Sequence, residues 1–417
     1  MASSATRAED LSTGRRALAF VTLMVFEFFY GWSWNTVDVL RPQIREQLGL
    51  TLTEAGSTYT AQSIGALVGA ITLGMVADHW GRRRTLFWVV VGYSVFGALG
   101  TVVSSFPQLL AQRFFLGFFL GAIFPVLIAT YMGLFADNLR GKLAALGQGT
   151  YNLSVIALGQ AYRFFGESGD WHTLLWAGAI PSLVLAPLIF VLIPDDRKVR
   201  AWGADEAPPP IAKLPIVELF RPELRRITGL LFLLVGLNFF AYQAFAGWVT
   251  TYLKEEKLYS ADVAGDVISW QFIGAVLGGF FWGWFSDRYG RRLSAIGFFI
   301  GAASVVLYLT VLESPGALRL GGALWGFMIT ASVAWAPWMS VLFPAHLRST
   351  AMSIFNWGRI ISMTAPLVTG LVADRFGLSA AMLLSAIGFG LGGLVWLLLP
   401  ETVGRARKPV KAAAVPV

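Results

Sequence analysis

Twelve apolar segments, each about as long as a membrane span, run through this chain of 417 residues. A helix needs about 20 mostly apolar residues to cross the hydrocarbon core of a bilayer. The segments cover residues 17–40, 56–77, 85–104, 107–132, 143–164, 173–193, 227–251, 263–285, 293–312, 316–343, 349–373 and 378–399. Lipid offers the backbone no hydrogen bonds, so each segment is predicted to be a helix. We expect an all-α membrane protein.

The amino-acid composition agrees with a chain that lies mostly within a lipid bilayer. Only 13% of the residues are charged, whereas roughly 25% is usual for soluble domains. There is no cysteine, which excludes disulfides, thiolate nucleophiles and cysteine-ligated metals. The histidines His79, His172 and His346 lie in polar connectors, so we expect no metal site in the membrane. The basic residues gather on no soluble domain, which excludes nucleic-acid binding. Because no nucleophile–base constellation is present, we predict neither an enzyme nor a cofactor.

A polar linker over residues 194–226 divides the segments into six and six. We predict an N-terminal tail, a six-helix bundle, the linker, a second six-helix bundle and a C-terminal tail, spanning residues 1–16, 17–193, 194–226, 227–400 and 401–417. The side that holds both termini carries 23 Lys and Arg residues, and the opposite side carries 7. By the positive-inside rule both termini are cytoplasmic. We expect an integral protein of the cytoplasmic membrane.

The two halves repeat each other at a nearly constant offset. A loop of the form Gly-x-x-x-Asp-x-x-Gly-Arg-Arg closes the second segment and, 209 residues later, the eighth. Its two copies consist of Gly74, Asp78, Gly81, Arg82 and Arg83, and of Gly283, Asp287, Gly290, Arg291 and Arg292. Pro194 and Pro400 follow the sixth and twelfth segments at an offset of 206. The chain is therefore a duplicated six-helix unit.

On these motifs the chain resembles the major facilitator superfamily, whose transporters are built from repeats. The resemblance covers about residues 17–404 and includes Arg113, Gly117 and Gly121 in the fourth segment and Pro400-Glu401-Thr402 after the twelfth. These features resemble the organic-acid:proton symporter and sugar-porter branches. The resemblance implies two pseudo-symmetric six-helix bundles around a central cavity that opens to each side of the membrane in turn.

Both loops with following arginines lie on the predicted cytoplasmic side, where we expect a gate. Asp78 and Asp287 are predicted to pair with nearby arginines or to cap a helix end, which latches the halves together until the cytoplasmic mouth opens. The alternative is that Arg82 and its neighbours only set the topology. A third copy of the short form, residues 370–377, contains Asp374 but lies on the outer side without the arginines. We therefore exclude it from the predicted gate.

Three of the 24 acidic residues approach the hydrocarbon, namely Glu27, Asp38 and Asp266. Ionisable groups there cost about 2.5–3.5 kcal/mol on insertion scales and are functional candidates by default. Glu27 lies ten residues into its segment, about 15 Å deep, and Asp38 shares its helical face to within about 20°. We predict that one of these two acids carries a proton. The alternative for Asp38 is an interfacial helix end, and for Asp266 that alternative is preferred.

Two arginines, Arg113 and Arg359, lie within apolar segments. Arg113 has about the depth of Asp38, and the two resemble the proton-linked acid–arginine pair of related symporters. Asn35 is the alternative match for the acid position. Arg359 lies near the midplane, where a guanidinium requires an anion because it cannot lose its proton. We expect Glu27 or a substrate carboxylate to meet it.

Polar and aromatic residues at similar depth are predicted to line the cavity on helices 1, 5, 7 and 11. Together with Arg359 they form the expected substrate site, and they are Trp34, Gln148, Tyr151, Asn152, Asn238, Tyr242, Gln243 and Asn356. The alternative is that they only hydrogen-bond between helices, each bond being worth under about 1 kcal/mol.

We predict proton-coupled symport of a small organic anion, a carboxylate or an acidic sugar. Arg359 is expected to bind the anionic group, the polar residues of helices 5 and 7 to read its substituents, and Glu27 or Asp38 to carry the proton. The alternatives are uptake of a neutral sugar with Arg359 paired to Glu27, a drug exporter, and a membrane sensor without transport. The expected partners are substrate, proton and lipid, with no obligate protein partner.

Overall fold

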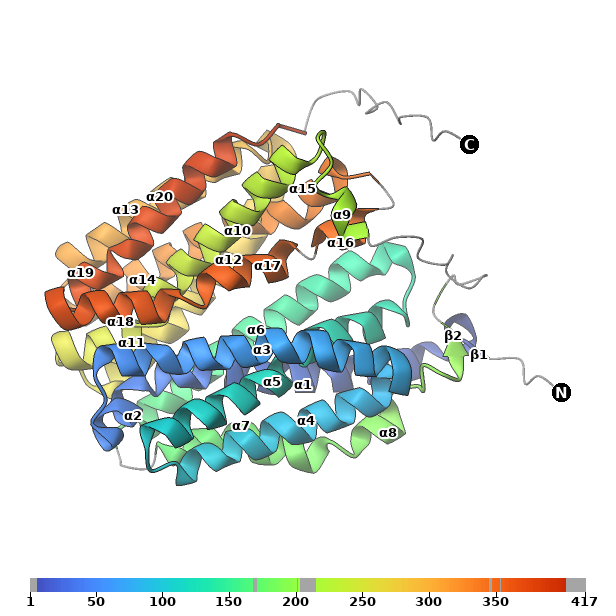
Figure 1. Ribbon diagram of the computed structural model, residues 1–417, viewed down its shortest axis with the longest axis horizontal. Helices are drawn as coiled ribbons and strands as arrows, with labels where there is room; N and C mark the ends of the chain where they lie inside the picture. The colour runs from blue at the N-terminus through green and yellow to red at the C-terminus, as the bar shows by residue number, and fades with distance from the viewer. Residues whose placement is uncertain are drawn as a thin grey trace.

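The fold consists of two bundles of long helices that are joined through the linker (Figure 1). The structure is a computed structural model, and it describes residues 6–167, 171–200, 202, 215–344, 347–352 and 354–402. In the N-terminal half the elements are β1 (Thr6–Arg7), η1 (Ala8–Asp10), α1 (Thr13–Val39), α2 (Arg41–Leu48), α3 (Leu52–Trp80), α4 (Arg82–Leu99), η2 (Gly100–Val102), α5 (Phe106–Met132), α6 (Asp137–Phe165), α7 (His172–Leu185) and α8 (Leu188–Leu192).

The linker and the C-terminal half follow the same plan. The linker contributes β2 (Val199–Arg200) and α9 (Pro215–Glu218). The C-terminal half contains α10 (Arg225–Ala246), α11 (Val249–Thr251), η3 (Tyr252–Glu256), α12 (Ala261–Tyr289), η4 (Leu293–Ala295), α13 (Ile296–Thr310), α14 (Pro315–Ile329), η5 (Thr330–Ala334), α15 (Trp335–Leu342), α16 (Arg348–Met352), α17 (Ile354–Ser362), α18 (Ala365–Phe376), α19 (Leu378–Met382) and α20 (Leu384–Leu397).

Nine helical segments of the described chain are long and apolar enough to cross a membrane. The three remaining predicted spans fall on α6, on α7 with α8, and on α16 to α18. The predicted all-α membrane fold is confirmed. One small addition is a parallel pair of strands, in which Thr6 and Arg7 of the N-terminal tail lie opposite Val199 and Arg200 of the linker.

The loop glycines of the repeated motif make the sharp turns that end two long helices. Gly81 has φ +90° between α3 and α4, and Gly290 has φ +115° after α12. Side chains disfavour these positive values because the Cβ atom clashes with the backbone, whereas glycine adopts them freely. The motif therefore has a local structural function in each half before any gating function.

Small residues allow the backbones of neighbouring helices to touch. A Cβ atom on Gly65 or Gly69 of α3 would meet the backbone of α5, and one on Gly117 or Gly121 of α5 would meet the backbone of α3. Such stripes of small residues are a usual way to pack helices in membranes, where apolar burial gives little driving force. The glycines of the fourth segment are thus packing residues.

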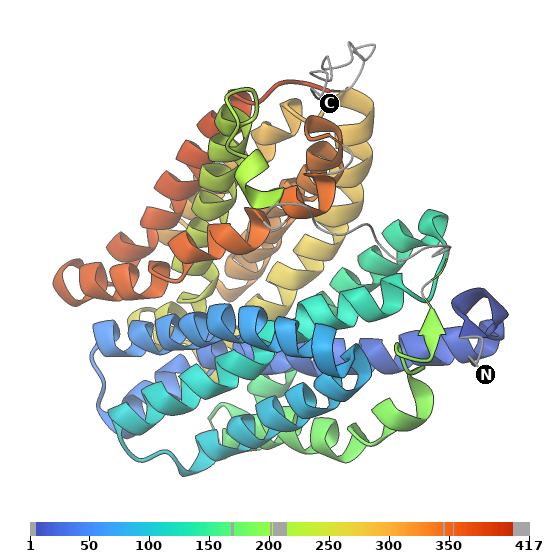
Figure 2. The ribbon, with the colours of Figure 1, turned by 45° about the vertical axis from the view of Figure 1, so that its right-hand side comes forward.

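The two halves contact each other at one end of the molecule. We call the end that holds both termini the terminal end and the opposite end the distal end, which includes residues 41–56, 160–167, 249–266 and 370–383. Figure 2 shows the ribbons of the halves converging at the distal end and diverging toward the terminal end. At the distal end α6 packs on α12, and α3 packs on α18.

Candidate functional site

The guanidinium of Arg359 reaches from α17 to α1 of the opposite half. Its Cζ lies 5.3 Å from the centroid of the Trp34 ring, which is cation–π distance. The hydroxyl of Tyr30 lies within electrostatic range of the same guanidinium. Trp34 and Tyr30 are both buried. Arg359 therefore joins the two halves near the middle of the predicted span.

Glu27 lies three residues before Tyr30 on α1 and is 2% exposed. The hydroxyls of Tyr30, Tyr93 and Tyr131 lie within electrostatic range of its carboxylate. Among the described residues, its Oε2 atom is buried without a hydrogen-bond partner. No ion pair joins Glu27 to Arg359 among the described residues, and the pairing of Arg359 with Glu27 or with a substrate carboxylate stays a prediction.

Aromatic rings form a wall beside Arg359. The Tyr30 ring centroid lies 5.9 Å from those of Trp34 and Tyr151, and the Trp34 ring meets Tyr59 edge-on at 6.2 Å. Asn35 donates from Nδ2 to the hydroxyl of Tyr151 over 2.9 Å. Sequence reasoning named Trp34 and Tyr151 but missed Tyr30 and Tyr59. Tyr30 could have been predicted from the sequence, because it precedes Trp34 by one helical turn and shares its face.

Asp38 forms a second junction between the halves. Its Oδ1 accepts a hydrogen bond from Arg41 at 2.5 Å, and its Oδ2 accepts one from Gln243 of the opposite half at 2.7 Å. The Arg41 guanidinium lies 4.3 Å from the centroid of the Trp248 ring. Arg113 is buried within electrostatic range of Asp38, and its Nε and Nη1 atoms have no hydrogen-bond partner in the described part of the chain. Arg41, not Arg113, is the direct partner of Asp38.

A small cavity adjoins Asp38 on the interface between the halves. It has a volume of about 20 Å³, and Asn35, Asp38, Tyr242 and Gln271 contribute polar atoms to its lining. That volume and lining suit one water molecule. Within the described residues, Nε2 of Gln271 is buried and has no hydrogen-bond partner. Nothing in the sequence pattern singled out Gln271 beyond its place in an apolar segment.

The other predicted site residues lie on the inner helices as expected from their depth. Gln148 donates from Nε2 to Oδ1 of Asn152 over 3.3 Å, both on α6. Asn238 is buried on α10, and the ring of Tyr242 stacks on that of Trp325 at 5.7 Å. The side chain of Asn356 lies outside the described residues. Whether these residues bind substrate stays a prediction.

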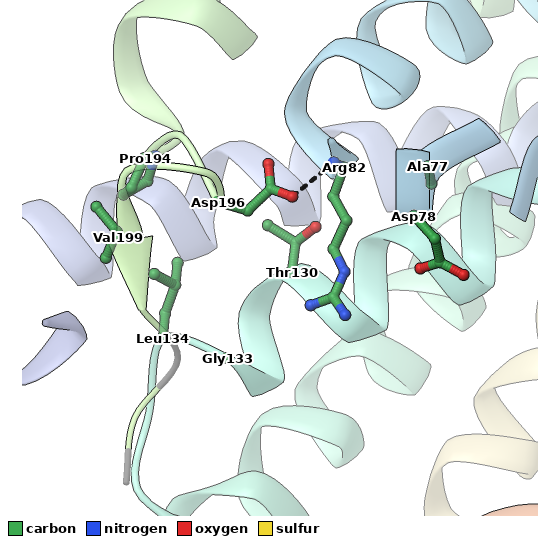
Figure 3. Close-up of a pocket in the computed structure, with 9 residues that line it drawn as sticks. All are labelled: Ala77, Asp78, Arg82, Thr130, Gly133, Leu134, Pro194, Asp196 and Val199. Carbon is green, nitrogen blue, oxygen red and sulfur yellow. Dashed lines mark hydrogen bonds between the residues drawn. The ribbon is translucent and has the colours of Figure 1, made fainter. Parts of the chain in front are cut away.

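A cavity of about 270 Å³ lies beside the loop after α3 at the terminal end, and Asp78, Arg82 and Asp196 are among the residues that line it (Figure 3). Nη1 of Arg82 donates to the backbone oxygen of Ala129 at 2.9 Å. The backbone N–H of Arg82 donates to Asp196 at 2.8 Å, and Nη2 of Arg83 pairs with Asp195 at 2.8 Å. These contacts tie the loop to the start of the linker, within the same half.

The loop after α12 is held in the same way. The backbone N–H groups of Arg291 and Arg292 donate to the carboxylate of Glu401 at 3.2 and 2.8 Å. Glu401 follows α20 as Asp196 follows α8, so the duplicated unit repeats its contacts as well as its motifs. The predicted latch through Asp78 and Asp287 stays a prediction for a state in which the terminal ends meet.

Charged groups join the halves at the distal end instead. Asp266 of α12 pairs with Arg163 of α6 at 2.7 Å and with Arg319 of its own half at 2.8 Å. Asp374 accepts hydrogen bonds from the first backbone N–H groups of α3. The copy of the motif that contains Asp374 was excluded from the predicted gate. This copy makes a contact between the halves at the distal end, and the prediction for the cytoplasmic gate stays a prediction.

The profile of the Major Facilitator Superfamily matches residues 23–261 and 231–417. Relatives include the 3-(3-hydroxy-phenyl)propionate transporter of Escherichia coli, with 26% identity over 94% of this chain and 96% of the relative. The gallate transporter of Pseudomonas putida is 25% identical over 89% of this chain and 88% of the relative. Sugar transporter ERD6-like 2 of Arabidopsis thaliana is 24% identical over 98% and 96%.

Solved structures share the fold at low sequence identity. A bacterial homologue of the lysosomal transporter Spinster, in an inward-facing conformation, has a TM-score of 0.79 at 14% identity and covers 93% of this chain and 97% of that one. The xylose transporter XylE of E. coli, in a partially occluded inward-open conformation, has a TM-score of 0.71 at 15% identity and covers 95% and 100%.

Proposed function

This chain belongs to the major facilitator superfamily, and from that premise we propose that it takes up a small aromatic or other organic carboxylate together with a proton. The observation that carries the proposal is Arg359, whose partly buried guanidinium lies between the two halves against an aromatic wall. A carboxylate satisfies its fixed charge with two parallel hydrogen bonds. The rings of Tyr30, Trp34 and Tyr151 offer stacking surface to an aromatic substrate. The names of the hydroxyphenylpropionate and gallate transporters support this class.

Uptake requires that Arg359 exchange partners during the cycle. In the present state its guanidinium lies against the Trp34 ring and near the hydroxyl of Tyr30. A substrate carboxylate is a stronger partner than a neutral hydroxyl, because it carries the opposite charge and accepts two parallel hydrogen bonds from the guanidinium. Hydroxyl groups of the bound substrate then hydrogen-bond to polar side chains of α1 and α6, namely Asn35, Gln148 and Asn152.

Glu27 is the proposed proton carrier. The described chain places no cation in an ion pair with it, and an isolated buried carboxylate favours its neutral, protonated form. Asp38 is instead bonded to Arg41 and, across the halves, to Gln243, so its carboxylate already has a structural function. A charge on Glu27 acts on Arg359 through Tyr30, which lies near both. Protonation of Glu27 removes the competing negative charge and so favours the binding of a substrate carboxylate.

The distribution of basic residues among the loops assigns each end of the protein to one side of the membrane. With 23 Lys and Arg residues on the side of both termini, the terminal end is assigned to the cytoplasm. The present structure, closed at the distal end, then corresponds to an inward-facing state of a transporter in the cytoplasmic membrane. We further propose that the protein is a transporter without catalytic activity.

Uptake into proteoliposomes under an imposed pH gradient tests the function. The substrate panel holds aromatic acids, short monocarboxylates, sugar acids and neutral sugars, each acid paired with its amide. We expect an inward proton gradient to drive accumulation of one class of acid and its amide to be a poor substrate. Accumulation of a neutral sugar, or equal affinity for acid and amide, contradicts the proposal and favours the sugar-uptake alternative.

A further inference from the structure

Two acids at the distal end cap helices of the opposite half. Asp374, at the end of α18, accepts hydrogen bonds from the backbone N–H groups of Leu52 and Thr53 at 3.1 and 3.0 Å, and from the hydroxyl of Thr53 at 2.5 Å. Leu52 is the first residue of α3. The first N–H groups of a helix lack partners within the helix and carry the positive end of its dipole. Asp374 therefore binds α3 across the interface.

Glu167, which follows α6 in the N-terminal half, caps the start of α12 in the C-terminal half. Its Oε1 accepts a hydrogen bond at 2.6 Å from the backbone N–H of Ala261, the first residue of α12. Lys254 pairs with the same oxygen at 2.9 Å. The Lys254 ammonium and the Ala261 N–H lower the pKa of Glu167, so it is ionised at neutral pH. Glu167 lies in the N-terminal half, and both of its partners lie in the C-terminal half.

The two caps occupy equivalent positions of the duplicated unit. Asp374 follows Glu167 by 207 residues, and Ala261 follows Leu52 by 209, which are the offsets of the repeat itself. Each acid closes the fifth helix of one six-helix unit and binds the start of the second helix of the other unit. The pair is therefore one contact made twice by the pseudo-two-fold symmetry.

The caps depend on a close approach that only a closed distal end provides. Next to the first cap, a Cβ atom on Gly370 would meet the backbone of Leu52, and one on Gly56 would meet the backbone of Pro366. Next to the second, Gly159 and Gly265 approach each other's backbone in the same way. When the halves separate here, both carboxylates lose their N–H partners together.

We propose that Asp374 and Glu167 form a paired outer latch, which holds the distal end closed in this state and must release both helix starts before the protein opens to the outside. The proposal rests on alternating access as the function but not on any substrate. An N-terminal cap shifts an equilibrium by about twofold to about thirtyfold. Loss of one cap should shift the ratio of distal-closed to distal-open protein by that factor. The two sites have no shared partner, so the factors should multiply in the double variant.

Distances between spin labels measure this ratio directly. The chain has no native cysteine, so introduced cysteines are labelled without background. Val102→Cys with Val311→Cys reports on the distal end, and Trp80→Cys with Tyr289→Cys reports on the terminal end. All four side chains are exposed, and each pair spans the two halves at equivalent positions, 209 residues apart. Measurement in lipid nanodiscs without substrate or proton gradient keeps the result independent of the transport proposal.

Asp374→Asn and Glu167→Gln should each populate a longer distal distance and a shorter terminal distance, and the double variant should do so most. Asp374→Glu and Glu167→Asp keep the carboxylate and should shift less. The matched control is Glu256→Gln, because Glu256 accepts the N–H of Ser379 at the start of α19 within its own half. Its distances should equal those of the unsubstituted protein.

Unchanged distal distances in the folded neutral variants would overturn the latch, as would an equal shift in the Glu256 control. If Glu167→Gln yields no folded protein, Lys254→Met weakens the same cap from its other side. An unchanged distal distance in Lys254→Met then overturns the proposal as well.

Discussion

At the scale of single residues, Arg359 carries a charge that every state of the transport cycle must accommodate. A guanidinium does not lose its proton in a protein, and burial without partners is costly. In this state it is stabilised by the Tyr30 hydroxyl and the Trp34 ring. These partners are neutral, so the site is ready for an anion.

The Arg359→Lys variant tests whether substrate binding needs the planar guanidinium or only its positive charge. Lysine keeps the positive charge but loses the planar fork that binds a carboxylate through two hydrogen bonds. We expect the Kd for a transported acid to rise by about tenfold to a hundredfold, the loss of one charge-assisted hydrogen bond, while the weak binding of the amide changes little. Isothermal titration of acid and amide against both proteins measures this. Equal losses for the two ligands would contradict direct carboxylate binding.

Glu27→Gln should uncouple transport from the proton gradient. Glutamine resembles the protonated acid, so the variant should exchange labelled for unlabelled substrate but fail to accumulate it uphill. Proteoliposome counterflow and gradient-driven uptake measure the two activities. Asp38→Asn is the matched comparison on the same helix, and it should impair both activities because Asp38 links Arg41 to Gln243 across the halves. If Asp38→Asn alone loses only uphill transport, Asp38 is the proton carrier.

Sequence reasoning located these residues but not all of their partners. The depth of a residue in the membrane follows from its position along the helix. Counting residues therefore placed Glu27, Asp38 and Arg359 within or next to the hydrocarbon core. Partners depend on how helices rotate and cross, which counting does not determine. Gln243, for example, meets Asp38 from the opposite half.

At the scale of helices, two of the predicted spans divide beside a proline, whereas Pro125 lies inside the continuous α5. The segment 173–193 divides at Pro187 into α7 and α8, and the segment 349–373 divides before α18, which has Pro366 in its first turn. Proline lacks the N–H group that continues a helix, so both breaks were readable in the sequence. The caps of α3 and α12 were not, because the acids that bind them come from the opposite half.

Helix packing also separates the glycines of α3 by function. A Cβ atom on Gly69 would meet the backbone of α5, whereas Gly74 and its repeat equivalent Gly283 have nothing within 4 Å. Gly74→Leu should therefore leave the melting temperature of the detergent-solubilised protein unchanged, while Gly69→Leu lowers it. If closure of the terminal end presses the other half onto Gly74, the same Gly74→Leu variant should transport at least about fivefold more slowly, the usual effect of overpacking. Normal transport by Gly74→Leu would remove Gly74 from the gate.

At the scale of the whole molecule, the duplication explains why closure can alternate. Equivalent loops are held by Asp196 and Glu401 at the terminal end, and equivalent helix starts are capped by Glu167 and Asp374 at the distal end. Because each end is made of two equivalent parts, each can close around the pseudo-two-fold axis. A central site is then reached from one side at a time.

Accessibility of the central site should therefore depend on the side of the membrane and on the outer latch. Gln148 shares a face of α6 with Asn152, Val155 and Gly159, at helical spacing, and Gly159 approaches α12 of the opposite half. Gln148→Cys should accordingly react with a membrane-impermeant thiol reagent in inside-out vesicles but not in right-side-out vesicles. Val102→Cys, at the distal surface, should show the reverse labelling.

The same reagent tests whether the latch governs access to the site. Adding Asp374→Asn and Glu167→Gln to Gln148→Cys should make the cysteine reactive from the outside, because the two helix starts are no longer held and the distal end opens. Adding Glu256→Gln should not. Outside labelling of Gln148→Cys with both caps intact would show that the terminal end faces outward, which reverses the assigned topology. If Gln148→Cys resists the reagent from both sides, it does not face the space between the halves, and α6 does not line the path to Arg359.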